Sequence, residues 1–110
     1  MLLVGVLGNS WACSGVSEGG VKATPSQHSV ALSWTASTSS NVKYNIYRAL
    51  YTNACGSFSK INDSEVPETS YTDSNVINAE SYCYGVKAAA SNGQESDYSN
   101  IVINVRIPPQ

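Results

Sequence analysis

The side chains that could do chemistry are few, and the first is a single histidine. His28 lies beside Ser26 and Ser29, and serine and histidine are two members of the triad used in nucleophilic hydrolysis. A triad also needs a carboxylate that orients the imidazole and an oxyanion hole. The sequence has no Gly-x-Ser-x-Gly elbow and no glycine-rich loop that would build them. We therefore expect His28 to be an exposed turn residue and the chain to be no enzyme.

One acidic cluster is the second candidate. Asp63, Glu65 and Glu68 are carboxylates that could act on a glycoside or collect calcium. They alternate with small and polar residues, as in a solvated loop, and lack EF-hand spacing. Asn62 begins an Asn-Asp-Ser glycosylation sequon, a tripeptide that is common by chance. We predict no catalytic site, no metal site and no cofactor.

Three cysteines, Cys13, Cys55 and Cys83, occur without Cys-x-x-Cys spacing, which disfavours zinc binding, thioredoxin-like redox chemistry and haem attachment. An odd number allows one intramolecular disulfide and leaves one thiol. Cys13 follows Ala12 and resembles the lipid-modified cysteine of bacterial lipoproteins, so we predict that it is either lipidated or a free thiol.

Composition restricts the class of protein. The chain has 110 residues, enough for one domain, with 42 % hydrophobic residues, 13 % charged residues and a net charge of −2. Nucleic-acid binding needs clustered Lys and Arg, so we exclude it. The apolar N-terminal stretch is too short for a transmembrane helix. We predict four segments: an apolar head (1–13), a Gly/Ser linker (14–20), one folded domain (21–107) and a tail (108–110).

Alternating apolar and polar residues separated by turns predict an all-β domain. Pro25-Ser26 and Asn92-Gly93 are predicted turns, the latter a hairpin turn that favours positive φ, and Leu50 to Gly56 is predicted to be a long loop. The predicted strands lie around Val21 and Ala23, Val30–Trp34, Tyr44–Tyr47, Phe58–Ile61, Ser70–Asp73, Tyr82–Ala88 and Ile101–Val105.

These segments carry recognisable motifs. The motifs are Val-Ala-Leu-Ser-Trp at 30–34, Tyr-Asn-Ile-Tyr-Arg at 44–48, Tyr-Cys-Tyr-Gly-Val-Lys-Ala at 82–88 and Ser-Asp-Tyr-Ser-Asn at 96–100. With them the chain resembles a fibronectin type III domain, in particular the Ser/Thr-rich versions of bacterial exported proteins. The resemblance implies a seven-stranded immunoglobulin-like β-sandwich of two antiparallel sheets. It also implies that Trp34 and Tyr82 mark the core, Tyr82 as a tyrosine-corner residue.

The topology of that family places the start of one strand of the second sheet beside the end of its neighbour. Cys83 and Cys55 fall at these two places, so the resemblance implies a Cys55–Cys83 disulfide. Tyr47, Tyr51 and Phe58 are expected near it. They form either an exposed interaction patch or a cover for the disulfide.

The predicted function is a non-catalytic structural or adhesive module, extracellular or in the cell envelope, with a protein partner. One alternative is a filament subunit that self-associates through an N-terminal strand. A second is a carbohydrate-binding accessory domain with a glycan ligand. The head would accordingly be a cleaved signal remnant, a lipid-anchored end or an assembly strand, in which the strand-forming residues are Leu2, Leu3, Val4, Val6 and Leu7.

Overall fold

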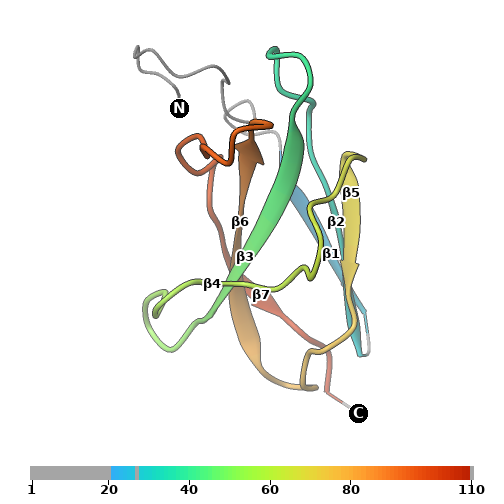
Figure 1. The fold of residues 1–110 in the computed structure, drawn as a ribbon. Helices are drawn as coiled ribbons and strands as arrows, with labels where there is room; N and C mark the ends of the chain where they lie inside the picture. The colour runs from blue at the N-terminus through green and yellow to red at the C-terminus, as the bar shows by residue number, and fades with distance from the viewer. Residues whose placement is uncertain (1–20, 27, 110) are drawn as a thin grey trace.

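Two antiparallel β-sheets pack face to face in the computed structural model, which describes residues 21–26 and 28–109. Figure 1 shows the three-stranded sheet on the right and the four-stranded sheet on the left. Sheets stacked in this way bury their inner faces in one shared core. The predicted all-β sandwich with seven strands is confirmed for this part of the chain.

The smaller sheet has the order β1-β2-β5. Its strands are β1 (Lys22–Ser26), β2 (Ser29–Ser33) and β5 (Ser70–Asp73). β2 is the central strand and pairs antiparallel with both neighbours. Val30 and Leu32 point inward and are buried, whereas Ala31 between them is exposed.

The larger sheet has the order β4-β3-β6-β7. Its strands are β3 (Lys43–Leu50), β4 (Ser59–Lys60), β6 (Ser81–Ala89) and β7 (Val102–Arg106). β3 and β6 pair along eight residue positions, so they form the rigid centre of this sheet. The described segments contain no helix long and apolar enough to cross a membrane.

Alternation along the strands builds the core. Trp34 lies directly after β2, is 6 % exposed, and packs edge-on against Tyr44 at a ring-centroid distance of 5.4 Å. The hydroxyl of Tyr82 accepts a hydrogen bond from the backbone N–H of Ile77 at 3.0 Å, which gives a buried phenol the partner it needs. The core also contains Val21, Val30, Leu32, Ile46, Val66, Val76, Tyr84, Val86, Ala88, Ala90, Val105 and Ile107.

Two local predictions were wrong, and one short edge strand is confirmed with narrower bounds than predicted. Pro25 and Ser26 lie inside β1, and the chain reverses at His28, which has a φ of 67°. A proline is tolerated there because β1 is an edge strand, where an N–H is dispensable. The strand predicted at Phe58–Ile61 contains only Ser59–Lys60, and Leu50 is the last residue of β3 rather than the start of a loop. The Asn92-Gly93 turn is present, with Gly93 at a φ of 91°.

Candidate functional site

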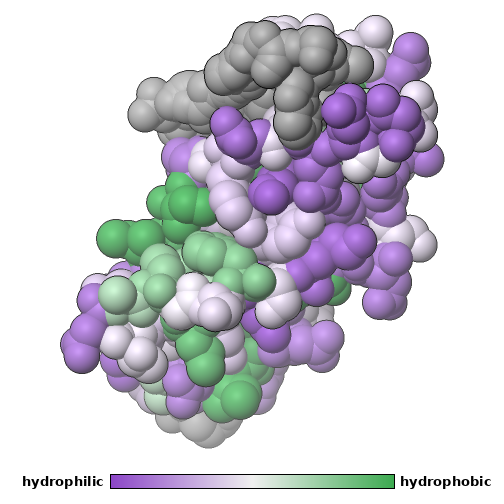
Figure 2. Space-filling view, turned by 60° about the vertical axis from the view of Figure 1, so that its left-hand side comes forward, coloured by the Kyte–Doolittle hydropathy of each residue, from purple (hydrophilic) through white to green (hydrophobic). Residues whose placement is uncertain are grey.

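The outer face of the four-stranded sheet carries the main group of aromatic and polar side chains. In the β3–β6 ladder, Asn45 pairs with Lys87 and Tyr47 pairs with Gly85. Strand geometry places all four on the face that points away from the core. Figure 2 looks onto this side of the molecule and shows apolar residues gathered in one region, with hydrophilic residues around them.

Three aromatic rings meet on this face. Tyr98 is central: its ring lies 5.3 Å from that of Tyr47, nearly perpendicular to it at 89°, and 5.4 Å from that of Phe58. All three side chains are partly exposed. Edge-to-face pairs at such distances stabilise each other beyond simple burial. We call these three rings together with Lys87 and Glu95 the outer-face cluster.

Gly85 forms the floor beneath Tyr98. A Cβ atom at Gly85 would lie 3.0 Å from the Tyr98 ring and 2.6 Å from the end of the Ile101 side chain. Any other residue would therefore require the end of the Ile101 side chain to shift and the Tyr98 ring to give by a few tenths of an ångström. The glycine favours this close approach and does not serve an unusual backbone conformation.

Two serines hold the segment that brings Tyr98 onto the sheet. The backbone N–H of Ala88 donates to the hydroxyl of Ser96 at 3.0 Å, and that of Val86 donates to the hydroxyl of Ser99 at 3.1 Å. Both serines are buried, and their own N–H groups bond back to the carbonyls of Ala88 and Val86. The segment between β6 and β7 is thus fixed to β6 without forming a regular strand.

A carboxylate organises the polar side of the cluster. Glu95 accepts hydrogen bonds from the amide of Asn45 at 2.6 Å and from the hydroxyl of Tyr47 at 2.9 Å. Lys87 places its ammonium 3.8 Å from Glu95 and 4.4 Å from the ring centroid of Tyr98. Burial and the neighbouring Glu95 raise the pKa of both Tyr47 and Tyr98, so both phenols stay neutral at physiological pH.

The predicted patch is therefore only partly the one observed. Tyr47 and Phe58 belong to the outer-face cluster, but Tyr51 makes no ring pair with it in the described part of the chain. Tyr51 instead forms a main-chain bridge with Cys55, beyond the end of β3. Tyr98 was not predicted to belong to the patch, because it lies outside any alternating segment. Its sequence signal is the Ser-Asp-Tyr-Ser-Asn motif at 96–100, in which two serines flank it.

The Cys55–Cys83 disulfide is present, with an S–S distance of 2.01 Å and a Cα–Cα distance of 6.0 Å. It links the loop after β3 to β6, one of the two central strands of the four-stranded sheet, and Cys83 is fully buried. Cys13 and the predicted assembly residues Leu2 to Leu7 lie outside the described residues. The predictions of lipidation and of an assembly strand therefore remain predictions.

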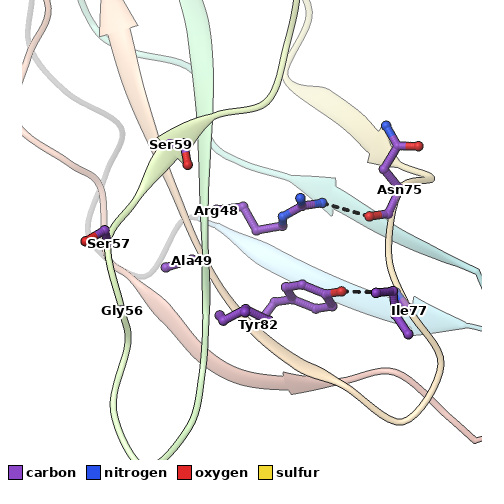
Figure 3. A pocket seen from close by; sticks show the side chains of 9 residues that line it. Arg48, Ala49, Gly56, Ser57, Ser59, Asn75, Ile77 and Tyr82 are labelled. Carbon is purple, nitrogen blue, oxygen red and sulfur yellow. Dashed lines mark hydrogen bonds between the residues drawn. The ribbon is translucent and has the colours of Figure 1, made fainter.

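An open groove of about 500 Å³ lies at one end of the sandwich (Figure 3). Arg48 and Tyr82 point into it from β3 and β6, toward the segment that contains Asn75 and Ile77. The guanidinium of Arg48 donates to Asp73 at 2.9 Å and to the carbonyl of Asn75 at 3.1 Å, and lies 5.1 Å from the Tyr82 ring centroid. These contacts give Arg48 a structural role in joining the two sheets.

The remaining candidate residues show no catalytic arrangement. His28 is exposed and its backbone N–H donates to Asn78 at 3.3 Å. Asp63, Glu65 and Glu68 are all exposed. Within residues 21–26 and 28–109, no group of three His, Cys, Asp or Glu side chains is placed to hold a metal ion.

The sequon residue Asn62 is 5 % exposed and has a structural role. Its side-chain oxygen accepts a hydrogen bond from the backbone N–H of Ile46 at 2.8 Å, and its amide nitrogen donates to Asn45 at 2.9 Å. A side chain held in this way is not available as a glycan acceptor.

Known proteins provide two kinds of similarity, although no protein-family model matches the sequence. In sequence, the chain is 40 % identical over 82 residues to an amylopullulanase of Thermoanaerobacter thermohydrosulfuricus. The match covers 74 % of this chain and 5 % of that enzyme, so the chain corresponds to a small part of its relative.

In structure, the chain is similar to an Fn3-like protein from Clostridium thermocellum, with a TM-score of 0.68 and 26 % identity, covering 91 % of this chain and 98 % of the other. A fibronectin type III domain of human fibronectin type III domain containing protein 3 matches at a TM-score of 0.61 and 20 % identity, over 91 % of this chain and 94 % of that one. Both neighbours share the sandwich described above. The chain therefore has the fold of a fibronectin type III domain.

Proposed function

We propose that this domain is a non-catalytic structural and adhesive module of an exported bacterial protein, either secreted or held at the cell surface. The observation that carries the proposal is that the sequence match covers most of this chain but very little of the matched enzyme. A segment that fills three-quarters of this chain is one-twentieth of the amylopullulanase. Such a segment is a module that accompanies other domains, and its sandwich fold supplies a rigid support.

The disulfide supports the exported location. Cys55 and Cys83 are bonded, and disulfides form and persist in oxidising compartments but are rare in the cytosol of most bacteria. The low content of charged residues, 13 % of the sequence, agrees with a role in contact rather than in electrostatic steering.

Cell fractionation with thiol alkylation tests this proposal. Antibody against the chain is used to recover it from medium, surface and cytoplasm of the source bacterium, and its cysteines are alkylated before mass analysis. We expect recovery from the medium or the surface, with Cys55 and Cys83 protected from alkylation until reduction. Cytoplasmic protein with both cysteines alkylated would contradict export. Release of reducing sugar from soluble starch by the purified chain would contradict the non-catalytic assignment.

A carbohydrate-binding accessory role is the second candidate. It is favoured by the name of the sequence relative, an amylopullulanase, because a module joined to such an enzyme gains effective concentration on the polymer when it binds the same glycan. The three partly exposed rings on the outer face provide a surface of suitable chemistry. Retardation of the chain in native gels that contain a neutral glucan tests this candidate.

A further inference from the structure

We propose that the outer-face cluster is a binding site for a neutral glycan, with Phe58 and Tyr47 flanking Tyr98 as the apolar platform and Lys87 as the hydrogen-bond donor. This inference rests on the carbohydrate-binding candidate and assigns that binding to named residues.

The rings supply the apolar half of the site. The Tyr98 ring centroid lies 5.3 Å from that of Tyr47 and 5.4 Å from that of Phe58, so the three rings form one continuous apolar surface. Aromatic side chains pack well against the C–H faces of a pyranose while its hydroxyls stay in water. The floor at Gly85 and the perpendicular Tyr47–Tyr98 contact hold the rings in place before binding. A ligand therefore loses little free energy in ordering them.

Lys87 supplies donors that the protein leaves unused. The ammonium carries three N–H groups, yet its nearest carboxylate oxygen, on Glu95, lies 3.8 Å away, which is beyond hydrogen-bond distance. No other acceptor among the described residues bonds to it, and its side chain is only 25 % exposed. Its remaining contacts are with the rings of Tyr98 and Tyr47. Half-enclosed donors beside an aromatic platform are suited to hydroxyl acceptors of a bound sugar.

Charge and area favour a neutral glycan over a charged polymer or a protein. Lys87 and Glu95 have opposite charges and lie side by side, so the site has no net charge to attract a polyanion or polycation. A protein partner in a stable complex covers roughly 800 Å² on each side. Three rings of about 150–250 Å² each, already partly covered by one another and by the sheet, provide less than that.

Affinity electrophoresis of the full 110-residue chain tests the site. Native gels containing soluble starch, pullulan or hydroxyethylcellulose, which are three neutral glucans, are compared with a gel that contains none. We expect retardation by at least one glucan. Phe58→Ala and Lys87→Met should each weaken binding by about tenfold, the size expected for loss of one ring contact or one set of donors.

Tyr51→Ala is the matched control, because Tyr51 is a partly exposed tyrosine just beyond the end of β3 and outside the cluster. It should bind as the unchanged chain does. Tyr98 is left intact, because its packing on Gly85 makes misfolding a competing explanation. Urea unfolding of every variant confirms that each is folded at the temperature of the gel.

The outcomes separate this inference from the proposals on which it depends. Retardation that Phe58→Ala and Lys87→Met leave unchanged, or that Tyr51→Ala abolishes, overturns the assigned site while carbohydrate binding stands. Absence of retardation by all three glucans overturns both the site and the carbohydrate-binding candidate. The exported structural role is tested by fractionation and survives either result.

Discussion

Loss of the Cys55–Cys83 disulfide will lower the free energy of unfolding by an amount that the topology sets. The disulfide joins residues 28 positions apart, and it links the loop after β3 to β6 across the intervening strands β4 and β5. In the chain-entropy model, closing a loop of that length removes about 3.5 kcal/mol of conformational freedom from the unfolded chain at 25 °C. The total stability of such a domain is about 5–15 kcal/mol, so the loss is a large part of it.

Urea unfolding measures this loss in two ways. Reduced protein keeps both sulfur atoms, so its difference from the oxidised protein isolates the effect of loop closure, and we expect about 3.5 kcal/mol and a melting temperature lower by roughly 15–25 °C. The double variant Cys55→Ala, Cys83→Ala should lose about 1 kcal/mol more, because Cys83 is fully buried and its truncation leaves a small cavity. Cys13→Ala, in which only the third thiol is lost, is the control and should unfold like the unchanged chain.

A loss below about 1 kcal/mol on reduction would refute the reasoning. It would mean that β3 and β6 already stay close in the unfolded chain, so that the disulfide restricts little. A simultaneous change in the urea m-value, which reports how much surface unfolding exposes, would identify that cause.

The ion pair between the sheets gives two further predictions. Tyr84→Phe removes the buried hydroxyl that donates to Asp73 at 2.7 Å and should cost about 1.5–3 kcal/mol in urea unfolding, as for hydrogen bonds to charged groups. Arg48→Met leaves the carboxylate of Asp73, 3 % exposed, without its cation, and should cost about 2–4 kcal/mol; an unchanged midpoint would show that solvent replaces the guanidinium. The third prediction concerns pH. Burial raises the pKa of Tyr84 and of Tyr47 above the ordinary value of tyrosine, and the hydrogen bonds from Tyr84 to Asp73 and from Tyr47 to Glu95 raise it further. Their stabilisation is therefore complete below about pH 10, where the unfolded tyrosines ionise, and is lost as pH rises further. The fall of the urea midpoint in alkali should be shallower in Tyr84→Phe, and an equal slope would contradict this assignment.

Local alternation predicted much of the fold. Tyr82, Tyr84, Val86 and Ala88 point to one side of a strand wherever that strand is placed, and the structure confirms them as core residues of β6. By the same alternation, the residues between them point to the opposite, outer face of β6. Alternation does not show that Cys83 on that face is fully buried, because what covers an outer face comes from elsewhere in the chain.

The candidate site was likewise predicted from the sequence only in part. Tyr47 and Phe58 were singled out by residue type and position, but Tyr51 was placed with them and Tyr98 was missed. Tyr51 is near Tyr47 in sequence yet lies past the end of β3, the strand that contains Tyr47. Tyr98 reaches Tyr47 only because a segment after β6 turns back over the sheet.

The sequence by itself determined the class of the protein: an all-β domain, the strands that build it and, for β2, β3 and β6, the inward side of each strand. These properties depend on residues one or two positions apart, and a period of two is visible in the chain. In β7 an irregular register with β6 buries Val105 but leaves Ile103 59 % exposed. Only the tertiary structure decided which aromatic rings meet, which carboxylate holds them and which lysine donors remain unused. Those contacts join residues about fifty positions apart, such as Tyr47 and Glu95. They depend on two serine hydroxyls and one glycine floor whose effect appears only when the strands are paired.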